Sequence, residues 1–525
     1  MPGHLRRLAT TGAAYTAASV LSKLIAVFLL PLYTAYLTPA DYGAAEVMLA
    51  SVVAASIVIR FGLIEAILRF YYVAGEDRRQ VVASGFASLF WTTTAGALVA
   101  LAFAGPISEA LLGQANADLA RLAILGLWTL TLWEFVLTLL RLDERPRLYF
   151  GLTVANVVVT IPVTVWLVVV EDLGAEAILL GTFGTGVGFL AWRLVAERRR
   201  LALRADAGLL RRMMRFGLPT MPAELTLYSL SFIDRIILVR LAGLAEAGLY
   251  ALAIKFASAI QVLARGFGLA FPPLAYSIAD DGEARRSYAL VVTWFAVLLA
   301  FAVTGLWLLA RWIVRLLATD EFFASHEAIG LLATGISLYA LYLALVVILG
   351  RTGRTEFNFP ATAAATAVNV GLNLALVPPL GIVGAGIALV ASYLVVLALM
   401  YAFTQRLFPV PWEWRRLALA VGAAAALIGI GEAFLPTEGL GGLAGRVGLW
   451  LAYPLVLWAL GFLTRDERRS LRTMLSPSAV AARLNALGAG APAAPAALAD
   501  EERRGPRLTS EVYDVTSLDE DRGGA

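Results

Sequence analysis

The chain has 525 residues, of which 60% are hydrophobic and 15% charged, and its formal net charge is +4. Soluble domains carry about 25% charged residues, so this composition excludes a large soluble core and predicts an all-α, polytopic membrane protein. The chain has no cysteine and two histidines. This excludes disulfides and thiolate chemistry and speaks against a histidine metal site or a Ser-His-Asp triad. We therefore expect no metal site and no cofactor.

Fourteen segments have about the 20 mostly apolar residues that a membrane-spanning helix requires. In chain order they cover residues 11–36, 44–72, 81–104, 119–140, 149–170, 174–195, 216–239, 245–274, 287–311, 327–349, 357–378, 381–404, 414–435 and 443–464. The first follows Arg6 and Arg7, but its apolar run is long, contains Pro31 and lacks a small-residue cleavage site. We therefore interpret it as a span and not as a signal peptide.

Arginines concentrate in alternate loops between these segments, for example at 78–79, 141–147 and 193–215. By the positive-inside bias, the arginine-rich loops are cytoplasmic. Both termini then lie on the cytoplasmic side, which requires an even number of spans and agrees with fourteen. We expect a multi-pass membrane protein with both termini in the cytoplasm.

Four cations lie inside long apolar segments: Lys23, Arg60, Lys255 and Arg265. None has an acidic residue three or four positions away, the spacing at which a helix pairs its own charges. A cation at the bilayer centre costs roughly 2.5–3.5 kcal/mol on insertion scales, so all four are expected to face the protein interior or water. We predict that they bind an anion arriving from elsewhere. Pairing with acids on neighbouring helices is the alternative that the sequence leaves open.

Four acids also lie in predicted spans: Glu46, Glu134, Glu224 and Asp234. Each is a candidate for ion coupling, because burial favours the protonated form of a carboxyl group. Each could equally be the counter-charge of an interior cation.

The two halves of the chain resemble each other at a nearly constant offset. Corresponding pairs include Gly43 and Gly248, Arg60 and Arg265, and Leu173 and Leu380, at offsets of 205, 205 and 207 residues. The offset spans six predicted helices, an even number, so both copies have the same orientation in the membrane. Such a parallel repeat places a site between the halves near mid-depth.

The repeat predicts four parts of the chain. Residues 1–200 form an N-terminal six-helix bundle and residues 201–410 a second one. Residues 411–465 add two transmembrane helices that lie outside the repeat. Residues 466–525 are rich in alanine and proline and then in charge, a composition typical of a disordered tail, here cytoplasmic.

Several motifs resemble a known family. They are L-S-K-L-I-A-V-F-L-L-P-L-Y from Leu21, F-G-L-P-T-M-P-A from Phe216, F-I-D-R-I-I from Phe232, A-G-L-Y-A-L-A-I-K from Ala247 and P-P-L-G-I-V-G-A-G from Pro378. Over residues 8–465 the chain resembles the polysaccharide-exporter branch of the multidrug/oligosaccharidyl-lipid/polysaccharide exporter superfamily. The resemblance implies two six-helix bundles around a central cavity that opens alternately to each side. It also implies an undecaprenyl-diphosphate-linked oligosaccharide as the substrate, whose diphosphate would accept charge-assisted hydrogen bonds from the interior cations.

We therefore predict a flippase for cell-surface polysaccharide biosynthesis and not an enzyme. The second possible function is that of a multidrug or cation antiporter of the same superfamily. Such an antiporter would need an acidic cavity for its cationic substrates. A peptidoglycan lipid-precursor flippase is a third and shares the same anion chemistry. A membrane glycosyltransferase or polymerase would need a metal-binding acid pair or a large external loop, and the sequence predicts neither. Expected partners are the lipid-linked anionic oligosaccharide, membrane lipids and polysaccharide polymerases or glycosyltransferases, and no nucleic acid.

Overall fold

The computed structural model describes residues 29–73 and 77–463, and every regular element within these ranges is a helix. The predictions for Lys23, for most of the first span and for the tail at 466–525 lie outside the described residues. The all-α fold class is confirmed.

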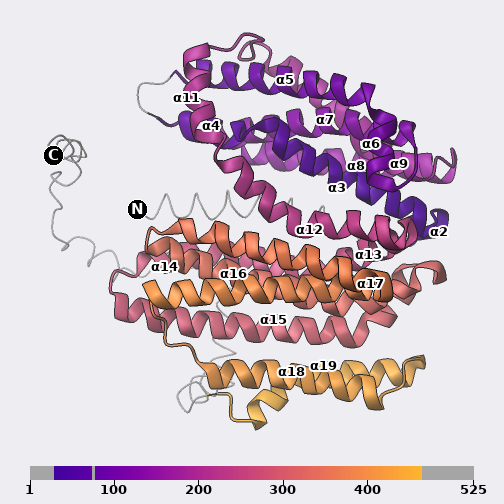
Figure 1. Ribbon diagram of the computed structural model, residues 1–525, viewed down its shortest axis with the longest axis vertical. Helices are drawn as coiled ribbons and strands as arrows, with labels where there is room; N and C mark the ends of the chain where they lie inside the picture. The colour runs from indigo at the N-terminus through magenta and orange to yellow at the C-terminus, as the bar shows by residue number, and fades with distance from the viewer. Residues whose placement is uncertain (1–28, 74–76, 464–525) are drawn as a thin grey trace, which may run out of the picture. The chain divides into compact units, whose positions relative to one another are not determined.

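The first half of the chain packs as one group of helices, coloured indigo to magenta in Figure 1. Its elements are α2 (Leu30–Tyr36), α3 (Pro39–Arg60), α4 (Leu63–Phe70), α5 (Arg78–Ala102), α6 (Ala104–Leu112), α7 (Ala117–Leu142), α8 (Pro146–Val169), α9 (Ala175–Leu179), a π-helical turn (Leu180–Gly184), α10 (Thr185–Glu197) and α11 (Ala207–Gly217). Helix α7 is central, because it packs against α3, α5, α6 and α10.

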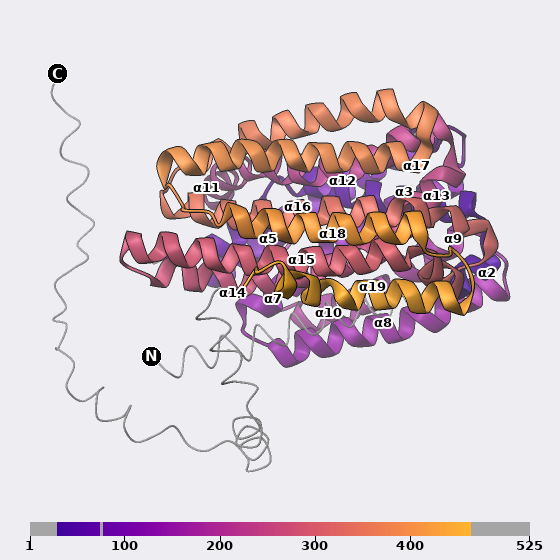
Figure 2. The ribbon, with the colours of Figure 1, turned by 90° about the horizontal axis from the view of Figure 1, so that it is seen from below.

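The second half begins with α12 and packs against the first half mainly through α12 and α13, both of which contact α3. Its elements are α12 (Thr220–Ala242), α13 (Leu244–Ala257), α14 (Ala259–Ser277), α15 (Asp281–Leu317), a 3₁₀ turn (Asp320–Ser325), α16 (His326–Arg351), a second 3₁₀ turn (Thr355–Phe357) and α17 (Asn358–Leu407). Two further helices, α18 (Trp414–Phe434) and α19 (Gly439–Ala459), run beside α15, as Figure 2 shows.

Local sequence signals set where several helices begin. The Thr38 side chain accepts a hydrogen bond from the backbone amide of Asp41 at the start of α3, and Asp280 does the same for Glu283 at α15. These side chains satisfy amide groups that the first helical turn leaves unpaired. Proline occupies the first position of α3 and of α8, where its missing N–H is not needed.

Ten helices of the described residues are long and apolar enough to cross a membrane, or eleven if the bent pair α13 and α14 forms one span. Helix α12 is not among them; it is 23 residues long and carries four charged residues. Helix α17 counts once, although its 50 residues far exceed the about 20 that one span needs and its backbone leaves the helical conformation at Gly381. The protein is thus a multi-pass membrane protein, and the number fourteen stays a prediction.

The internal repeat is visible in the backbone. Gly174 has φ 55° and ψ −131°, and Gly381, its counterpart in the second half, has φ 51° and ψ −129°. Each lies beside an acid in the first turn of a helix of its own half. The backbone N–H of Ile382 donates to Glu246 at 3.1 Å, and a Cβ added to Gly174 would lie 3.9 Å from a carboxylate oxygen of Asp41. The two halves therefore share a detail that only glycine adopts readily.

We expect Gly381→Ala to destabilise the protein by about 1–3 kcal/mol, the usual cost of forcing a side chain into a glycine-only conformation. The added Cβ would also lie 2.6 Å from a carboxylate oxygen of Glu246. Thermal unfolding in detergent measures the effect. Gly371→Ala, in the same helix, is the control, because a Cβ there meets nothing within 4 Å. Equal melting temperatures for the two variants would contradict this prediction.

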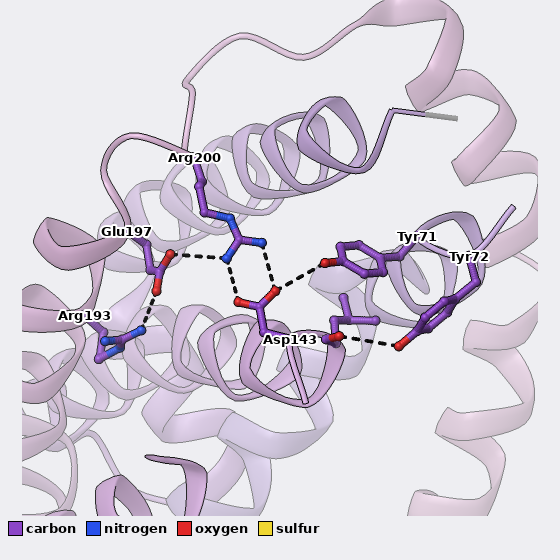
Figure 3. Close-up of polar contacts among 7 residues, drawn as sticks. Tyr71, Tyr72, Asp143, Arg193, Glu197 and Arg200 are labelled. Carbon is purple, nitrogen blue, oxygen red and sulfur yellow. Dashed lines mark hydrogen bonds and ion pairs between the residues drawn. The ribbon is translucent and has the colours of Figure 1, made fainter. Parts of the chain in front are cut away.

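A polar cluster ties the loop between the halves to the first half (Figure 3). The Arg200 guanidinium donates to both carboxylate oxygens of Asp143, at 2.6 and 3.0 Å. The Tyr71 hydroxyl donates to the same carboxylate at 3.2 Å. Glu197 lies between Arg200, at 3.4 Å, and Arg193, at 2.6 Å. The cluster joins the ends of α4, α7 and α10 at one place.

The residues that follow this cluster in the chain also pack against the first half. The Trp91 indole donates to the backbone carbonyl of Leu203 at 3.0 Å. Helix α11 then packs on α4 and α5. Gly62 and Gly217 approach so closely that a Cβ on Gly62 would lie 2.0 Å from the Gly217 carbonyl oxygen. The connector and α11 therefore belong structurally to the first half, and α12 begins directly after them.

Candidate functional site

A cavity of about 930 Å³ lies between the two halves. Its walls come from α3 and α7 of the first half and from α12, α13, α14, α16 and α17 of the second. The polar lining consists of three arginines, three acids, four tyrosines and one glutamine: Arg60, Arg235, Arg265, Glu134, Glu224, Asp234, Tyr228, Tyr250, Tyr339, Tyr393 and Gln261. With all six charged side chains ionised, their charges cancel.

Arg60 is the most connected of these side chains. It is the last residue of α3, where Phe61 takes a left-handed conformation with φ 50° and ends the helix. The guanidinium is buried and donates to the Ser56 carbonyl at 3.2 Å. It forms ion pairs with Glu134 of α7 and, at 2.9 Å, with Glu224 of α12. One cation thus links three helices from both halves.

Arg60 and Lys255 both have ion-pair partners on other helices. The ammonium group of Lys255 is ion-paired with Glu46 of α3, and the guanidinium of Arg235 lies 3.7 Å from the other carboxylate oxygen of Glu46. The partners lie on other helices, so the spacing within one helix could not reveal them. The alternative left open by the sequence, that the acids are counter-charges, holds for Glu46, Glu134 and Glu224.

The structure brings together much of the predicted set. The repeat-related arginines Arg60 and Arg265 both line the cavity, as do Glu134, Glu224 and Asp234. Lys255 and Glu46 are not among the lining residues; their ion pair lies at the contact between α3 and α13.

Asp234 is fully buried and sits in a polar cluster that the sequence analysis missed. The Tyr250 hydroxyl donates to its carboxylate at 2.8 Å, and the Asn373 amide donates to the other oxygen at 2.8 Å. Within the described part of the chain, both polar atoms of Asn369 and the carbonyl oxygen of Asn373 are buried without a hydrogen-bond partner. Two asparagines four residues apart in an apolar helix were the available signal, because buried polar side chains in a membrane rarely lack a role.

The second half contributes an aromatic wall. The rings of Tyr339 and Tyr393 are 5.4 Å apart, and Tyr342 lies 5.8 Å from Tyr339. Tyr228 stacks on Phe232 at 6.0 Å. A tyrosine offers an apolar face and a polar hydroxyl in one rigid side chain. The cavity therefore combines a charged side, centred on Arg60, with an aromatic side.

The fold and the site together define the class of protein: a multi-pass membrane protein built from two repeated helical halves around a charged internal cavity. The chain belongs to the family described as "Polysaccharide biosynthesis protein", whose model matches residues 35–327. It belongs with that family to the polysaccharide-exporter superfamily that the motifs resembled, which confirms that prediction.

Individual relatives agree with this assignment. The succinoglycan biosynthesis transport protein ExoT of Rhizobium meliloti (strain 1021) is 31% identical over 190 residues, which cover 32% of this chain and 37% of ExoT. The chain thus aligns with little more than a third of that relative.

Solved structures share the fold. The lipid II flippase MurJ, in an inward closed conformation, has a TM-score of 0.67 at 11% identity, covering 86% of this chain and 98% of MurJ. An inward-facing multidrug resistance MATE family transporter of the MOP superfamily has a TM-score of 0.59 at 15% identity, covering 74% and 94%.

Proposed function

We propose that the protein is a flippase that moves an undecaprenyl-diphosphate-linked oligosaccharide across the bacterial cytoplasmic membrane, for cell-surface polysaccharide biosynthesis. The observation that carries the proposal is the ion-paired Arg60 in a cavity between two repeated halves. Membership of a polysaccharide biosynthesis family supports the substrate class. The alternating halves would expose this cavity first to the cytoplasm and then to the outside.

The paired state of Arg60 suits an exchange of anions. A buried cation without a counter-charge is strongly unfavourable, so the empty protein needs Glu134 and Glu224. Their side chains are 35% and 40% exposed, which lets them turn toward water when another anion arrives. A diphosphate then accepts hydrogen bonds from the same guanidinium, whose planar fork matches phosphate oxygens. Arg265 supplies a second cation in the same cavity.

The aromatic side of the cavity suits the sugar. Binding sites for small molecules combine apolar and aromatic walls with a few placed polar groups. Tyr339 and Tyr393 provide such a wall on α16 and α17. We propose that the diphosphate binds toward Arg60 and the glycan toward these tyrosines.

Asp234 is the residue we propose for ion coupling. Its carboxylate lies between two helices of the second half and lines the cavity, beside unpartnered amide atoms of Asn369 and Asn373 among the described residues. A carboxylate can take up a proton, and carboxylate and amide oxygens are the ligands that a small hard cation such as Na⁺ prefers. Glu46, Glu134 and Glu224 serve as counter-charges in this proposal.

Two other functions compete with this one. Three carboxylates line the cavity, and this favours a multidrug or cation antiporter as the second candidate. A peptidoglycan lipid precursor also carries a diphosphate and would use the same arginines. We propose polysaccharide polymerases or glycosyltransferases as partners that supply or consume the flipped lipid.

Binding of the purified protein to undecaprenyl diphosphate, with and without attached sugar, tests the proposal across a salt series in Na⁺ and in K⁺. We expect binding that weakens with salt, because arginine–phosphate attraction is screened by ions, and that tightens when the sugar is present. Binding of an organic cation in preference to the diphosphate lipid would overturn the proposal and favour the antiporter. Equal affinity with and without sugar would contradict the assignment of the tyrosine wall.

A further inference from the structure

The contact between α3 and α13 is unusually close at one end of the cavity. Gly43 and Gly248 face each other: a Cβ on Gly43 would lie 2.1 Å from the Leu244 carbonyl oxygen, and one on Gly248 would lie 1.9 Å from the Pro39 carbonyl oxygen. No side chain fits between the two backbones. The arginine distribution assigns this end of α3 to the outside of the membrane.

Other bonds join the halves at the same end. The Arg240 guanidinium, at the end of α12, donates to the carbonyls of Glu109 and Ala110 in α6 at 2.9 and 2.6 Å. The Thr319 hydroxyl donates to the carbonyl of Thr34 at 2.8 Å. These contacts come from helix ends and turns that the predicted topology places outside. The cavity is therefore closed toward the outside.

One ion-pair group lies at this closure. Lys255 of α13 is paired with Glu46 of α3, and Arg235 of α12 donates to the Glu46 backbone carbonyl at 3.2 Å. The Lys255 ammonium group also lies 4.9 Å from the centre of the Tyr42 ring. The Glu46 side chain is only 8% exposed, against 35% for Glu134 in the cavity. Water thus reaches Glu134 in the cavity much more than it reaches Glu46.

We propose that Glu46, Lys255 and Arg235 form a latch that holds the outer end of the cavity shut. The acid belongs to the first half and both cations to the second. Opening to the outside separates α3 from α13, so it must break this group and return its charges to water. Such a group has two stable arrangements, packed and paired or apart and hydrated, as a gating element requires. Alternating access is part of the proposed function, and the latch rests on it.

The chain has no native cysteine, so a single reporter cysteine tests the latch without background. Val53→Cys places the reporter on the α3 wall of the cavity. We expect a membrane-impermeant maleimide added outside to label it slowly in the otherwise wild-type protein. With Glu46→Gln added, labelling from outside should accelerate roughly tenfold, the size of a typical coupling between two states.

The matched control is Glu432→Gln, which removes a charge from another helix-to-helix ion pair, with Arg446, far from α3 in the sequence. It should leave the outside labelling rate unchanged. An unchanged rate in Glu46→Gln, or an equal acceleration in both variants, would overturn the latch. The readout needs no substrate, so it remains decisive even if the diphosphate lipid does not bind.

Exchanging the charges of Glu46 and Lys255 distinguishes loss of the latch from misfolding of a variant. We expect Glu46→Lys and Lys255→Glu alone to accelerate outside labelling. The double variant should label more slowly than Glu46→Lys alone, because it restores one ion pair, but faster than wild type, because Arg235 then faces a cation at position 46. If the double variant labels as fast as Glu46→Lys alone, although thermal unfolding shows that it is folded, the latch is contradicted.

Discussion

Substitution of Arg60 by alanine is expected to abolish transport and to lower stability together. The change leaves Glu134 and Glu224 without the cation that joins them. Truncating one member of a buried charge group costs about 3–5 kcal/mol, and the partial exposure of both glutamates places the loss near the lower bound. Export of the proposed substrate, a lipid-linked oligosaccharide, should fall at least about 30-fold, since loss of such a contact costs about 2 kcal/mol or more.

A triple variant separates the two effects. Arg60→Met combined with Glu134→Gln and Glu224→Gln removes all three charges, so neither glutamate position is left as a carboxylate without its cation. We expect its melting temperature to recover most of the loss, while transport stays absent because the guanidinium proposed to bind the diphosphate, that of Arg60, is missing. Transport at the wild-type rate in the triple variant would show that Arg60 is a structural residue. Arg265→Ala, the repeat-related change, should also reduce transport.

The second large effect is expected at the junction of α4, α7, α10 and the connector. Asp143→Asn should destabilise the protein by about 2 kcal/mol, because it removes a carboxylate that is only 10% exposed and accepts both guanidinium bonds of Arg200. The matched control is Asp118→Asn. Its ion pair with Arg121 is 72% and 60% exposed, and exposed pairs contribute about 0–1 kcal/mol. Thermal unfolding in detergent compares the two.

The destabilisation caused by Asp143→Asn should become smaller as the pH falls. Burial opposes ionisation of the Asp143 carboxyl, but the hydrogen bonds and charge of Arg200, with the Tyr71 hydroxyl, hold its pKa below the usual range. The folded protein thus binds this proton less readily than the unfolded chain, and the carboxylate stabilises the fold above its unfolded pKa of about 3.9. The difference between wild type and Asp143→Asn should be constant near neutral pH and shrink as the pH falls below about 4. A difference that grows on acidification would contradict this assignment.

Much of the fold could be predicted from the sequence, because long apolar runs and arginine-rich loops are direct consequences of the bilayer. The repeat was also readable, and its weakest sequence match, at Leu173 and Leu380, proved to adjoin the two glycines with the same backbone geometry. Arg60 and Arg265 could be predicted as candidate site residues, because a charged side chain in an apolar membrane segment is costly unless it faces the protein interior or water.

The pairing of these charges could not be predicted. Glu134 and Glu224 are 74 and 164 residues from Arg60 in the chain, and no spacing rule reaches that far. Neutral polar residues were missed for a different reason. Asn369 and Asn373 add no charge to their helix, so they carry little weight in a search for interior ions, although they surround the buried Asp234.

The contact of Gly43 with Gly248 also reveals a difference between the two halves. These glycines correspond to each other in the two halves, so the pseudo-twofold axis passes between them. The residues that correspond to Glu46 and Lys255 are Ala251 and Ala50, so the ion pair occurs on one side of the axis only. Two identical subunits would carry such a pair twice or not at all. Because both halves belong to one chain, their sequences can differ at this contact, and here one side is charged while the other has two alanines.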